Sequence, residues 1–307
     1  MLSSKNFRIV FATLLGMLLL ASCAPAQGLS LTSGKITATQ EPTDDTLLPP
    51  LVTSTLKPTN TVTITPIPPT PTATATPTQK LIYNEPGRID APILLYHHVE
   101  GDISNGRYTV SVPDFQAQMQ TLQEMGYTPI PISLFLDALL DGAEIPEKPV
   151  VITFDDGHES VYENAFPIMN AYDFPGVFYI VANRLNGVED FVDVPEIREM
   201  IAAGWEIGSH SYSHIDLTEN HESVSREITE SKSILENALA IQVETFAYPF
   251  GTIDSFLAQK VSDYRYRAGM GLGTRSTHTW NNLFYLERIE IYGDYSLEEF
   301  KALLSSD

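Results

Sequence analysis

The 307-residue chain has a single cysteine and few basic side chains, with 18 Lys and Arg against 39 Asp and Glu. One cysteine excludes an intrachain disulfide and a cysteine-rich zinc site. The formal net charge of -21 argues against a nucleic-acid partner, because phosphate binding needs a basic surface. The acidic balance suits a protein that handles a neutral or cationic polymer, and it is equally compatible with a solvated surface that has no partner.

The apolar run near the N-terminus, Ile9 to Leu20, is too short to span a membrane with normal flanks. It follows two basic residues and ends in Leu20-Ala-Ser-Cys23, which resembles the lipobox of bacterial lipoproteins. That resemblance implies a signal peptide over residues 1–22 and a lipid on Cys23 that anchors the exported chain to the cell membrane. An ordinary secretory signal with a chance cysteine is the alternative.

Large apolar residues are scarce over residues 23–82, where Thr, Pro, Ser and Ala dominate. Such a segment cannot bury enough surface to offset the entropy of ordering, and its prolines favour extended, semi-stiff stretches. We therefore expect a disordered linker here and a folded domain over residues 83–307. The linker would let the domain stand off the membrane towards the cell envelope or the exterior.

Segments with strand character alternate with helical segments along the folded part. Expected strands cover residues 92–99, 150–154, 177–181, 205–208, 245–248, 266–270 and 286–291. Expected helices cover residues 114–125, 132–140, 160–171, 195–203, 219–239, 254–262 and 297–304. This alternation predicts an α/β fold with a mainly parallel sheet or barrel.

Two adjacent carboxylates follow the central strand, Val150 to Phe154, which is apolar on both faces. Burying a carboxylate is costly unless it is paired or binds a metal, so Asp155 and Asp156 should lie just past the strand, at its carboxyl end. Neighbouring residues of an extended chain point to opposite sides, so the two can serve different functions. The alternative is a turn or helix cap, since Asp-Asp-Gly is common turn chemistry.

His210 and His214 follow another short strand. On a helical turn this spacing places both imidazoles on one face, where they could bind one ion. Two histidines with one carboxylate, from Asp155 or Asp156, make a zinc-like ligand set that leaves positions open for water. Solvated surface histidines are the alternative.

A third strand end carries Phe246-Ala-Tyr-Pro-Phe-Gly251. Pro249 fixes the turn and Gly251 permits close approach, so the backbone N–H of Phe250 could face a developing oxyanion. By itself the stretch also fits an ordinary aromatic turn.

Together these stretches resemble the NodB-like polysaccharide deacetylases of carbohydrate esterase family 4, over about Ile93 to Ile291. The stretches that match family motifs are Thr153–Gly157, His210–His214 and Tyr248–Gly251. The resemblance implies a distorted (β/α) barrel, with Asp155 as the base and Asp156 as a metal ligand beside the two histidines. The sequence around residues 93–99 and 204–210 is most similar to the branch acting on poly-β-1,6-N-acetylglucosamine, or to spore and cell-wall relatives.

The chain departs from the family pattern in two places. Ala247 stands where the family usually has an arginine that orients the base, and we hypothesise that Arg288 supplies this charge. No clear late Leu-x-His motif provides the usual general acid. His97 is the candidate substitute and His98 the alternative, although either could be a buried structural histidine. The remaining histidines expected at the surface are His158, His221 and His278.

The resemblance implies metal-dependent removal of N-acetyl groups from a hexosamine polysaccharide such as poly-N-acetylglucosamine, peptidoglycan or a chitin-like polymer. The metal would be zinc, with Co²⁺ or Ni²⁺ as alternatives. It would activate the water that Asp155 deprotonates, Phe250 would help stabilise the oxyanion, and a histidine would protonate the leaving amine. The alternatives are an O-acetyl esterase acting on a xylan-like polymer and a catalytically silent glycan-binding lipoprotein. We expect a monomer.

Overall fold

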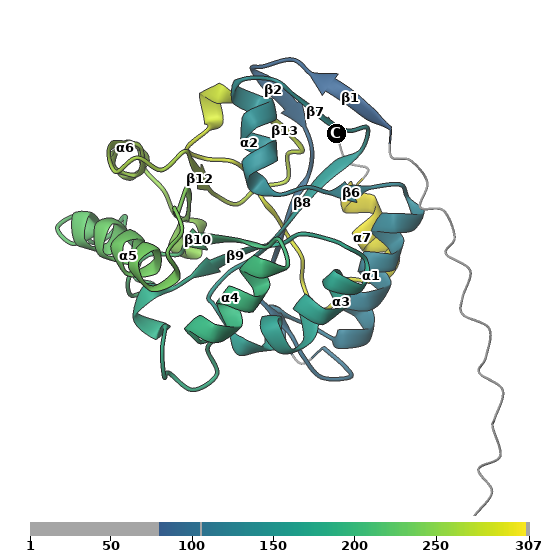
Figure 1. Ribbon diagram of the computed structural model, residues 1–307, viewed down its shortest axis with the longest axis horizontal. Coiled ribbons are helices and arrows are strands. Elements are labelled where there is room, and N and C mark those ends of the chain that lie inside the picture. The colour runs from purple at the N-terminus through teal and green to yellow at the C-terminus, as the bar shows by residue number, and fades with distance from the viewer. Residues whose placement is uncertain (1–79, 105, 305–307) are drawn as a thin grey trace, which may run out of the picture. The chain divides into compact units, whose positions relative to one another are not determined.

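A computed structural model of the chain describes residues 80–104 and 106–304 (Figure 1). The expected signal peptide, Cys23 and nearly all of the expected linker lie outside these residues. The first strand begins at Leu81, close to the expected start of the folded domain at residue 83. Among the helices of the described residues, none has the length and apolar character needed to cross a membrane.

The fold is built on a curled, eight-stranded sheet in which the strand pairs are parallel. Seven strands follow the order β12-β11-β10-β9-β8-β3-β14, and β6 pairs with β8 beside this path. These strands are β3 (Ile93–Tyr96), β6 (Thr128–Pro129), β8 (Pro149–Phe154), β9 (Val177–Ile180), β10 (Glu206–Ser209), β11 (Thr245–Ala247), β12 (Ala268–Met270) and β14 (Ile289–Glu290).

The two edges of this sheet approach each other through the chain just before β14. Leu286 bridges Met270 of β12 in parallel, and the Gly271 N–H donates to the Leu286 carbonyl at 2.8 Å. A few residues later the same segment pairs with β3. The sheet therefore curls towards closure, and the prediction of a distorted (β/α) barrel is confirmed.

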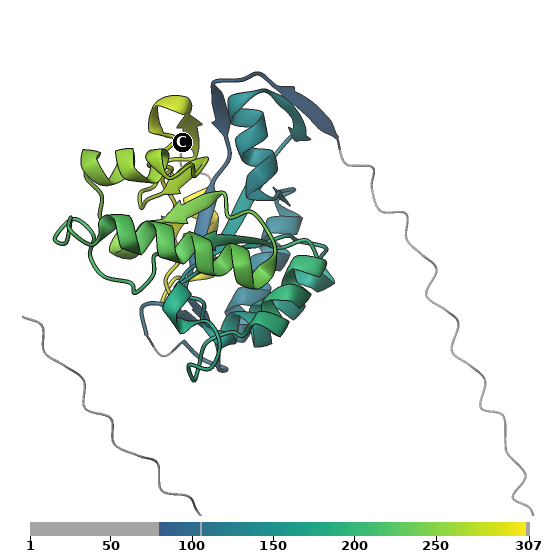
Figure 2. The same cartoon turned by 60° about the vertical axis from the view of Figure 1, so that its left-hand side comes forward.

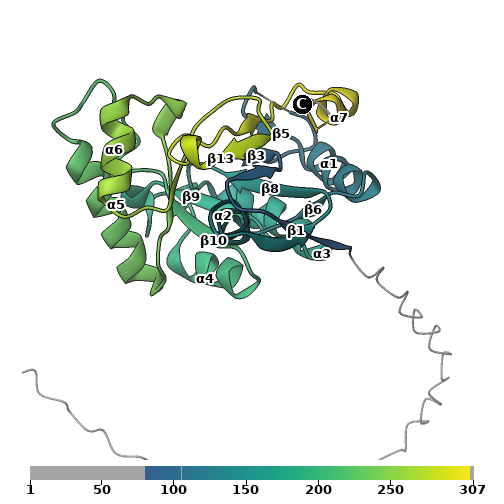
Figure 3. The same ribbon diagram turned by 90° about the horizontal axis from the view of Figure 1, so that it is seen from above.

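Helices surround the sheet, and Figure 3 shows α7 beside α1 while Figure 2 shows α5 in front. Their bounds are α1 (Val112–Glu124), α2 (Ile132–Leu140), α3 (Phe166–Ala171), α4 (Val194–Ala202), α5 (Val224–Leu239), α6 (Ser255–Asp263) and α7 (Leu297–Leu304). Single turns of other helix types cover Val161–Ala165, Ala182–Arg184, Pro249–Gly251 and Trp280–Asn282.

The alternation of side chains along β8 explains how the fold positions Asp155. Val150, Ile152 and Phe154 lie in the larger apolar cluster, whereas Val151 belongs to the smaller cluster. Successive residues of a strand point to opposite faces. Asp155 therefore continues the face of Val151, which carries its carboxylate to the mouth of the curled sheet.

Two expected helices differ from their observed forms. The segment expected as a helix over residues 160–171 starts with a π-helical turn, and α3 follows with Pro167 in its first turn. Proline lacks an N–H and clashes with the preceding turn, which accounts for the interruption. Helix α5 begins at Val224 rather than Glu219, because side chains of Asp216 and Asn220 bond to nearby backbone or side-chain groups in a turn ahead of it.

Three short pairings outside the main sheet were missed by the sequence analysis: β1 (Leu81–Asn84) with β7 (Ala143–Pro146), β2 (Arg88–Asp90) with β13 (Thr277–Thr279), and β4 (His98–Val99) with β5 (Thr109–Val110). His278 lies in β13 and is fully buried against Phe135, so its predicted surface position is wrong. His221 is exposed and bonds Asp254 at 2.7 Å, as expected for a surface residue, while His158 is half-buried.

Candidate active site

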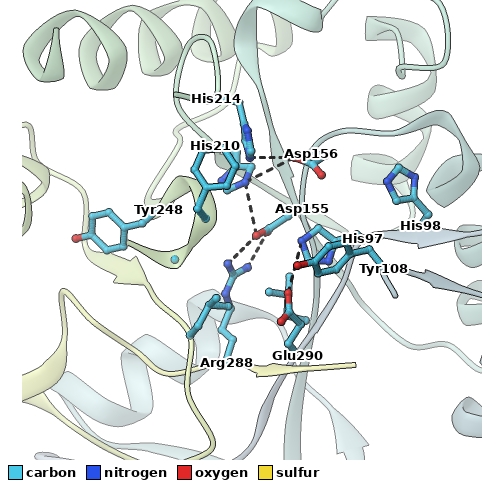
Figure 4. Close-up of a pocket in the computed structure, with 14 residues that line it drawn as sticks. His97, His98, Tyr108, Asp155, Asp156, His210, His214, Tyr248, Arg288 and Glu290 are labelled. Atoms are coloured by element: carbon cyan, nitrogen blue, oxygen red, sulfur yellow. Dashed lines mark hydrogen bonds and ion pairs between the residues drawn. The ribbon is translucent and has the colours of Figure 1, made fainter. Parts of the chain in front are cut away.

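One cavity of about 360 Å³ lies where β3, β8, β10, β11 and β14 end, and polar side chains far apart in the sequence meet in it (Figure 4). Parallel strands place their carboxyl ends at the same edge of a sheet, which is where α/β folds hold their sites. The polar residues that line it are His97, His98, Tyr108, Asp155, Asp156, His210, His214, Arg288 and Glu290.

Asp156, His210 and His214 converge with one potential ligand atom each, and these atoms lie within 4.8 Å of one another. The Asp156 Oδ1 atom is 3.2 Å from His214 Nε2 and 3.8 Å from His210 Nε2. Ligands held at about 2 Å by one tetrahedral zinc ion would be ~3.3 Å apart. The two separations from Asp156 are thus close to those that a shared ion requires.

The backbone that produces this convergence is not the helical turn expected for His210 to His214. Ser211 and His214 have left-handed φ values of 65° and 59°, and the segment is an irregular loop. The loop is held by Glu227 of α5, whose carboxylate accepts hydrogen bonds from the backbone N–H groups of Tyr212 and Ser213 at 3.0 and 2.8 Å. The sequence analysis missed Glu227, since a glutamate inside an amphipathic helix carries no local signal of such a role.

The environment of the three side chains suits a divalent cation. The His210 Nδ1 atom is 2.8 Å from the Ala247 carbonyl, which directs Nε2 towards Asp156. Burial and the neighbouring His210 lower the pKa of His214 to about 4, so its imidazole is neutral and can offer a lone pair. Asp156 Oδ1 is buried and accepts no hydrogen bond from the described residues. A buried carboxylate oxygen with no hydrogen-bond donor among these residues, close to the imidazoles of His210 and His214 and 3.9 Å from Arg184 Nη1, fits a metal site.

Asp155 is held by Arg288 in a bidentate ion pair. Arg288 Nη1 and Nη2 each lie 2.7 Å from a different oxygen of the Asp155 carboxylate, and Arg288 Nε donates to the Gly271 carbonyl. Burial alone would raise the pKa of Asp155, but the charges of Arg288 and His210 and the hydrogen bonds from Arg288 outweigh it and lower the pKa to about 2. The hypothesis that Arg288 provides the charge missing at Ala247 agrees with this geometry.

The two candidate acids occupy different places in the cavity (Figure 4). The His97 ring centroid is 4.9 Å from that of Tyr108, and His97 Nε2 is 4.0 Å from Glu290 Oε1. His98 instead faces His158, with ring centroids 4.3 Å apart, beyond Asp156 in the view. Glu290 and Tyr108 were not singled out in the sequence, because nothing local marks them as neighbours of His97.

The aromatic turn after β11 forms another part of the wall. Phe250 has a left-handed φ of 60°, and its exposed ring contacts His214 with centroids 4.6 Å apart. The Phe250 N–H donates to no acceptor among the described residues, so it is available to a ligand. Tyr248 points its hydroxyl away from the cavity, to the Phe284 carbonyl at 2.9 Å.

The curled parallel sheet thus brings a potential metal-binding triad beside an arginine-bound aspartate at the carboxyl ends of its strands. The protein-family model described as "Polysaccharide deacetylase" matches residues 142–269. The chain therefore carries a polysaccharide deacetylase domain and is an enzyme of that class, which confirms the resemblance seen in the motifs. The matched residues include Asp155, Asp156 and both histidines of the triad, whereas His97, Arg288 and Glu290 lie outside them.

Known proteins similar to this chain have related names, and a solved structure shares its fold. A putative polysaccharide deacetylase, YxkH of Bacillus subtilis, is 26% identical over 219 residues, which cover 70% of this chain and 76% of that protein. The poly-β-1,6-N-acetyl-D-glucosamine N-deacetylase of Staphylococcus aureus is 26% identical over 202 residues, covering 61% and 69%. The structure of the deacetylase PplD of Streptococcus pyogenes superposes with a TM-score of 0.64 at 24% identity, covering 70% of this chain and 98% of PplD.

Proposed function

We propose that this chain removes N-acetyl groups from a polymer of N-acetylglucosamine, in a reaction that requires a divalent metal ion. The observation that carries the proposal is the convergence of Asp156, His210 and His214 beside an aspartate held by Arg288. The name of the Staphylococcus aureus relative supports an N-acetylglucosamine polymer as the substrate.

Asp156, His210 and His214 would hold the ion, with zinc the first choice and Co²⁺ or Ni²⁺ as alternatives. When bound, such an ion lowers the pKa of a coordinated water and polarises the acetyl carbonyl. The ligand set of two imidazoles and one carboxylate is of the kind that leaves positions open for water and substrate.

Asp155 would serve as the base. Its low pKa keeps the carboxylate ionised at neutral pH. The bidentate pair with Arg288 prevents the carboxylate from rotating and so fixes the direction of both oxygens. A carboxylate held in this way accepts a proton from the attacking water without first having to reorient.

His97 would donate the proton that the leaving amine needs. The Glu290 carboxylate lies 4.0 Å from His97 Nε2, and the ring of Tyr108 packs beside the imidazole and restricts its motion. The free N–H of Phe250 would bind the oxygen that gains charge during attack on the amide. The products are acetate and a sugar with a free amine.

The enzyme would work at the cell envelope, anchored by a lipid on Cys23 and separated from the membrane by the Thr- and Pro-rich segment up to residue 82. The support is the sequence alone: a short apolar run, the lipobox-like residues before the only cysteine, and a composition that does not support a packed core. The acidic charge of the chain agrees with a product polymer that becomes cationic.

The test is acetate release from β-1,6-linked N-acetylglucosamine oligomers, chitooligosaccharides, peptidoglycan and acetylated xylan, with and without a chelator. We expect release from a glucosamine-type polymer that stops on chelation and returns when Zn²⁺ or Co²⁺ is added. Release from acetylated xylan alone would indicate an O-acetyl esterase. Bound metal without acetate release on any glycan would favour a silent glycan-binding protein and overturn the proposal.

A further inference from the structure

A second cavity, of about 610 Å³, adjoins the catalytic one and plays no part in the chemistry described above. It is lined by Ser104, Gly106, Arg107, Tyr292, Asp294 and Tyr295. We propose that it is a subsite for a neighbouring sugar unit of the polymer whose acetyl group enters the catalytic cavity. This inference rests on the proposed function.

Tyr108 lies between the catalytic cavity and Tyr292 of the second cavity. Its side chain lines the catalytic cavity, and the residue remains 46% exposed. The ring centroid of Tyr108 is 4.9 Å from that of His97 on one side and 6.2 Å from that of Tyr292 on the other. If one sugar of the polymer lies beside His97, the next sugar would therefore contact Tyr108 and Tyr292.

The second cavity has two tyrosine rings in its wall, and a planar cation lies over one of them. The rings of Tyr292 and Tyr295 have centroids 5.1 Å apart. The Arg107 guanidinium lies 4.0 Å from the Tyr292 ring centroid and bonds the Tyr292 hydroxyl at 2.5 Å. Sites for small ligands combine aromatic side chains with a few fixed polar groups, in cavities of about 300–1,000 Å³. Sugars suit such a surface because their apolar ring faces stack while their hydroxyls reach polar neighbours.

The charges around the cavity favour a neutral occupant. The Tyr292 hydroxyl also bonds the Glu290 carboxylate, and the carboxylate of Asp294 lines the cavity. These two acids offset the charge of Arg107, so the cavity has no net positive charge to attract an anionic ligand such as a phosphate. An N-acetylated sugar carries no charge and avoids this cost.

The surface is preformed, because two loops are tied together beneath it. The Gly293 N–H donates to the Arg107 carbonyl at 2.9 Å, and the His98 N–H donates to the Tyr108 carbonyl at 3.0 Å. A Cβ added at Gly293 would lie 2.0 Å from the Thr109 carbonyl oxygen, so only glycine allows this approach. A binding surface fixed before the ligand arrives loses less conformational entropy on binding.

The experiment compares a long with a short substrate. The kcat and KM for acetate release are measured with a β-1,6-linked N-acetylglucosamine hexamer and with p-nitrophenyl acetate, which can occupy only the catalytic cavity. The variants are Tyr295→Ala and Arg107→Ala, with Tyr295→Phe as the conservative replacement. Tyr83→Ala is the matched control, because Tyr83 is 57% exposed on β1 and lines neither cavity.

We expect the two alanine variants to raise KM for the hexamer about five- to tenfold while kcat stays within twofold. The ratio of kcat/KM for the hexamer to that for the ester should fall by the same factor, and Tyr295→Phe and Tyr83→Ala should keep the wild-type ratio. An unchanged hexamer KM in both alanine variants, with an active wild type, would overturn the subsite alone. A wild type that releases no acetate from any glucosamine polymer would instead remove the proposed function and the subsite with it.

Discussion

The cavity of this enzyme has two walls that differ in how the chain builds them. The metal-side wall consists of Asp156, His210 and His214, which follow β8 and β10 within short sequence motifs. The β3–β14 wall consists of His97, Arg288 and Glu290, which come from strands paired across nearly the whole folded part of the chain. The comparison teaches that local spacing reveals candidate metal ligands, whereas the candidate acid and the residues beside it depend on distant strand pairing.

Substitutions at the metal-side wall and at Asp155 should have the largest effects on kcat. His210→Ala should lose both the bound metal and at least ~10³-fold in kcat, whereas Asp155→Asn should lose a similar factor and keep the metal. Metal content by mass spectrometry and acetate release from the same samples separate the two effects. His221→Ala is the control, since that histidine is exposed, does not line the cavity and pairs with Asp254. Wild-type deacetylation by Asp155→Asn would refute the base assignment.

Removal of the arginine tests whether the β3–β14 wall supports the fold as well as the chemistry. Arg288 and Asp155 are both almost completely buried, and a buried charge left without its partner costs about 3–5 kcal/mol. Arg288→Met should therefore lower the free energy of urea unfolding by about this amount and suppress acetate release.

The double variant Arg288→Met with Asp155→Asn supplies the control for that loss. It no longer buries an unpaired charge, so it should recover most of the stability while remaining inactive. A loss below ~1 kcal/mol in the single variant, or no recovery in the double variant, would show that the pair contributes little to folding.

The adjacent residues His97 and His98 allow a comparison with a smaller expected effect. His97→Gln should lower kcat about 10²-fold, because general acid catalysis typically contributes 10²- to 10⁴-fold. His98→Gln should lower kcat less than about fivefold, since His98 faces His158 instead of Glu290. Steady-state kinetics of both variants on the same oligomer shows which histidine is the acid. A larger loss of kcat in the His98 variant would assign the acid role to His98.

The features that the sequence predicted and those that it missed differ in the same way as the two walls. The parallel α/β alternation, the carboxylates after β8 and the histidine pair after β10 could be read locally, because burial and spacing within a few residues determine them. The loop geometry of Ser211 and His214 could not, because it depends on left-handed backbone and on Glu227 of a distant helix. Arg288 was found by asking which charge could replace Ala247, but its contact with Asp155 depends on how the sheet closes.

The neighbours of His97 mark the limit of such reading. Glu290 reaches His97 through the β3–β14 pairing, and Tyr108 reaches it from the segment before β5. Neither residue has a spacing or neighbour that signals its place. A sequence read one segment at a time therefore finds ligands before it finds the groups around the acid.

His278 extends the comparison away from the cavity, since the missed pairing of β13 with β2 is what buries it. Burial lowers its pKa from an ordinary 6.5 to about 4, although the charges of Glu287 and Asp90 act in the opposite direction. Between these values the unfolded chain binds the proton more readily than the folded chain. Stability is therefore lost as the pH falls below 6.5, by at most about 1.4 kcal/mol for each pH unit from this residue.

Urea unfolding at intervals from pH 7.5 to 4.5 measures this dependence. His278→Leu cannot bind the proton in either state, so its curve should be flatter than that of the wild type below pH 6.5. Above pH 7 the two curves should run parallel, with any constant offset reporting the change in packing against Phe135. Equal slopes below pH 6.5 would mean that the folded protein opens this site to water, and the pairing of β13 with β2 would then not protect the histidine in solution.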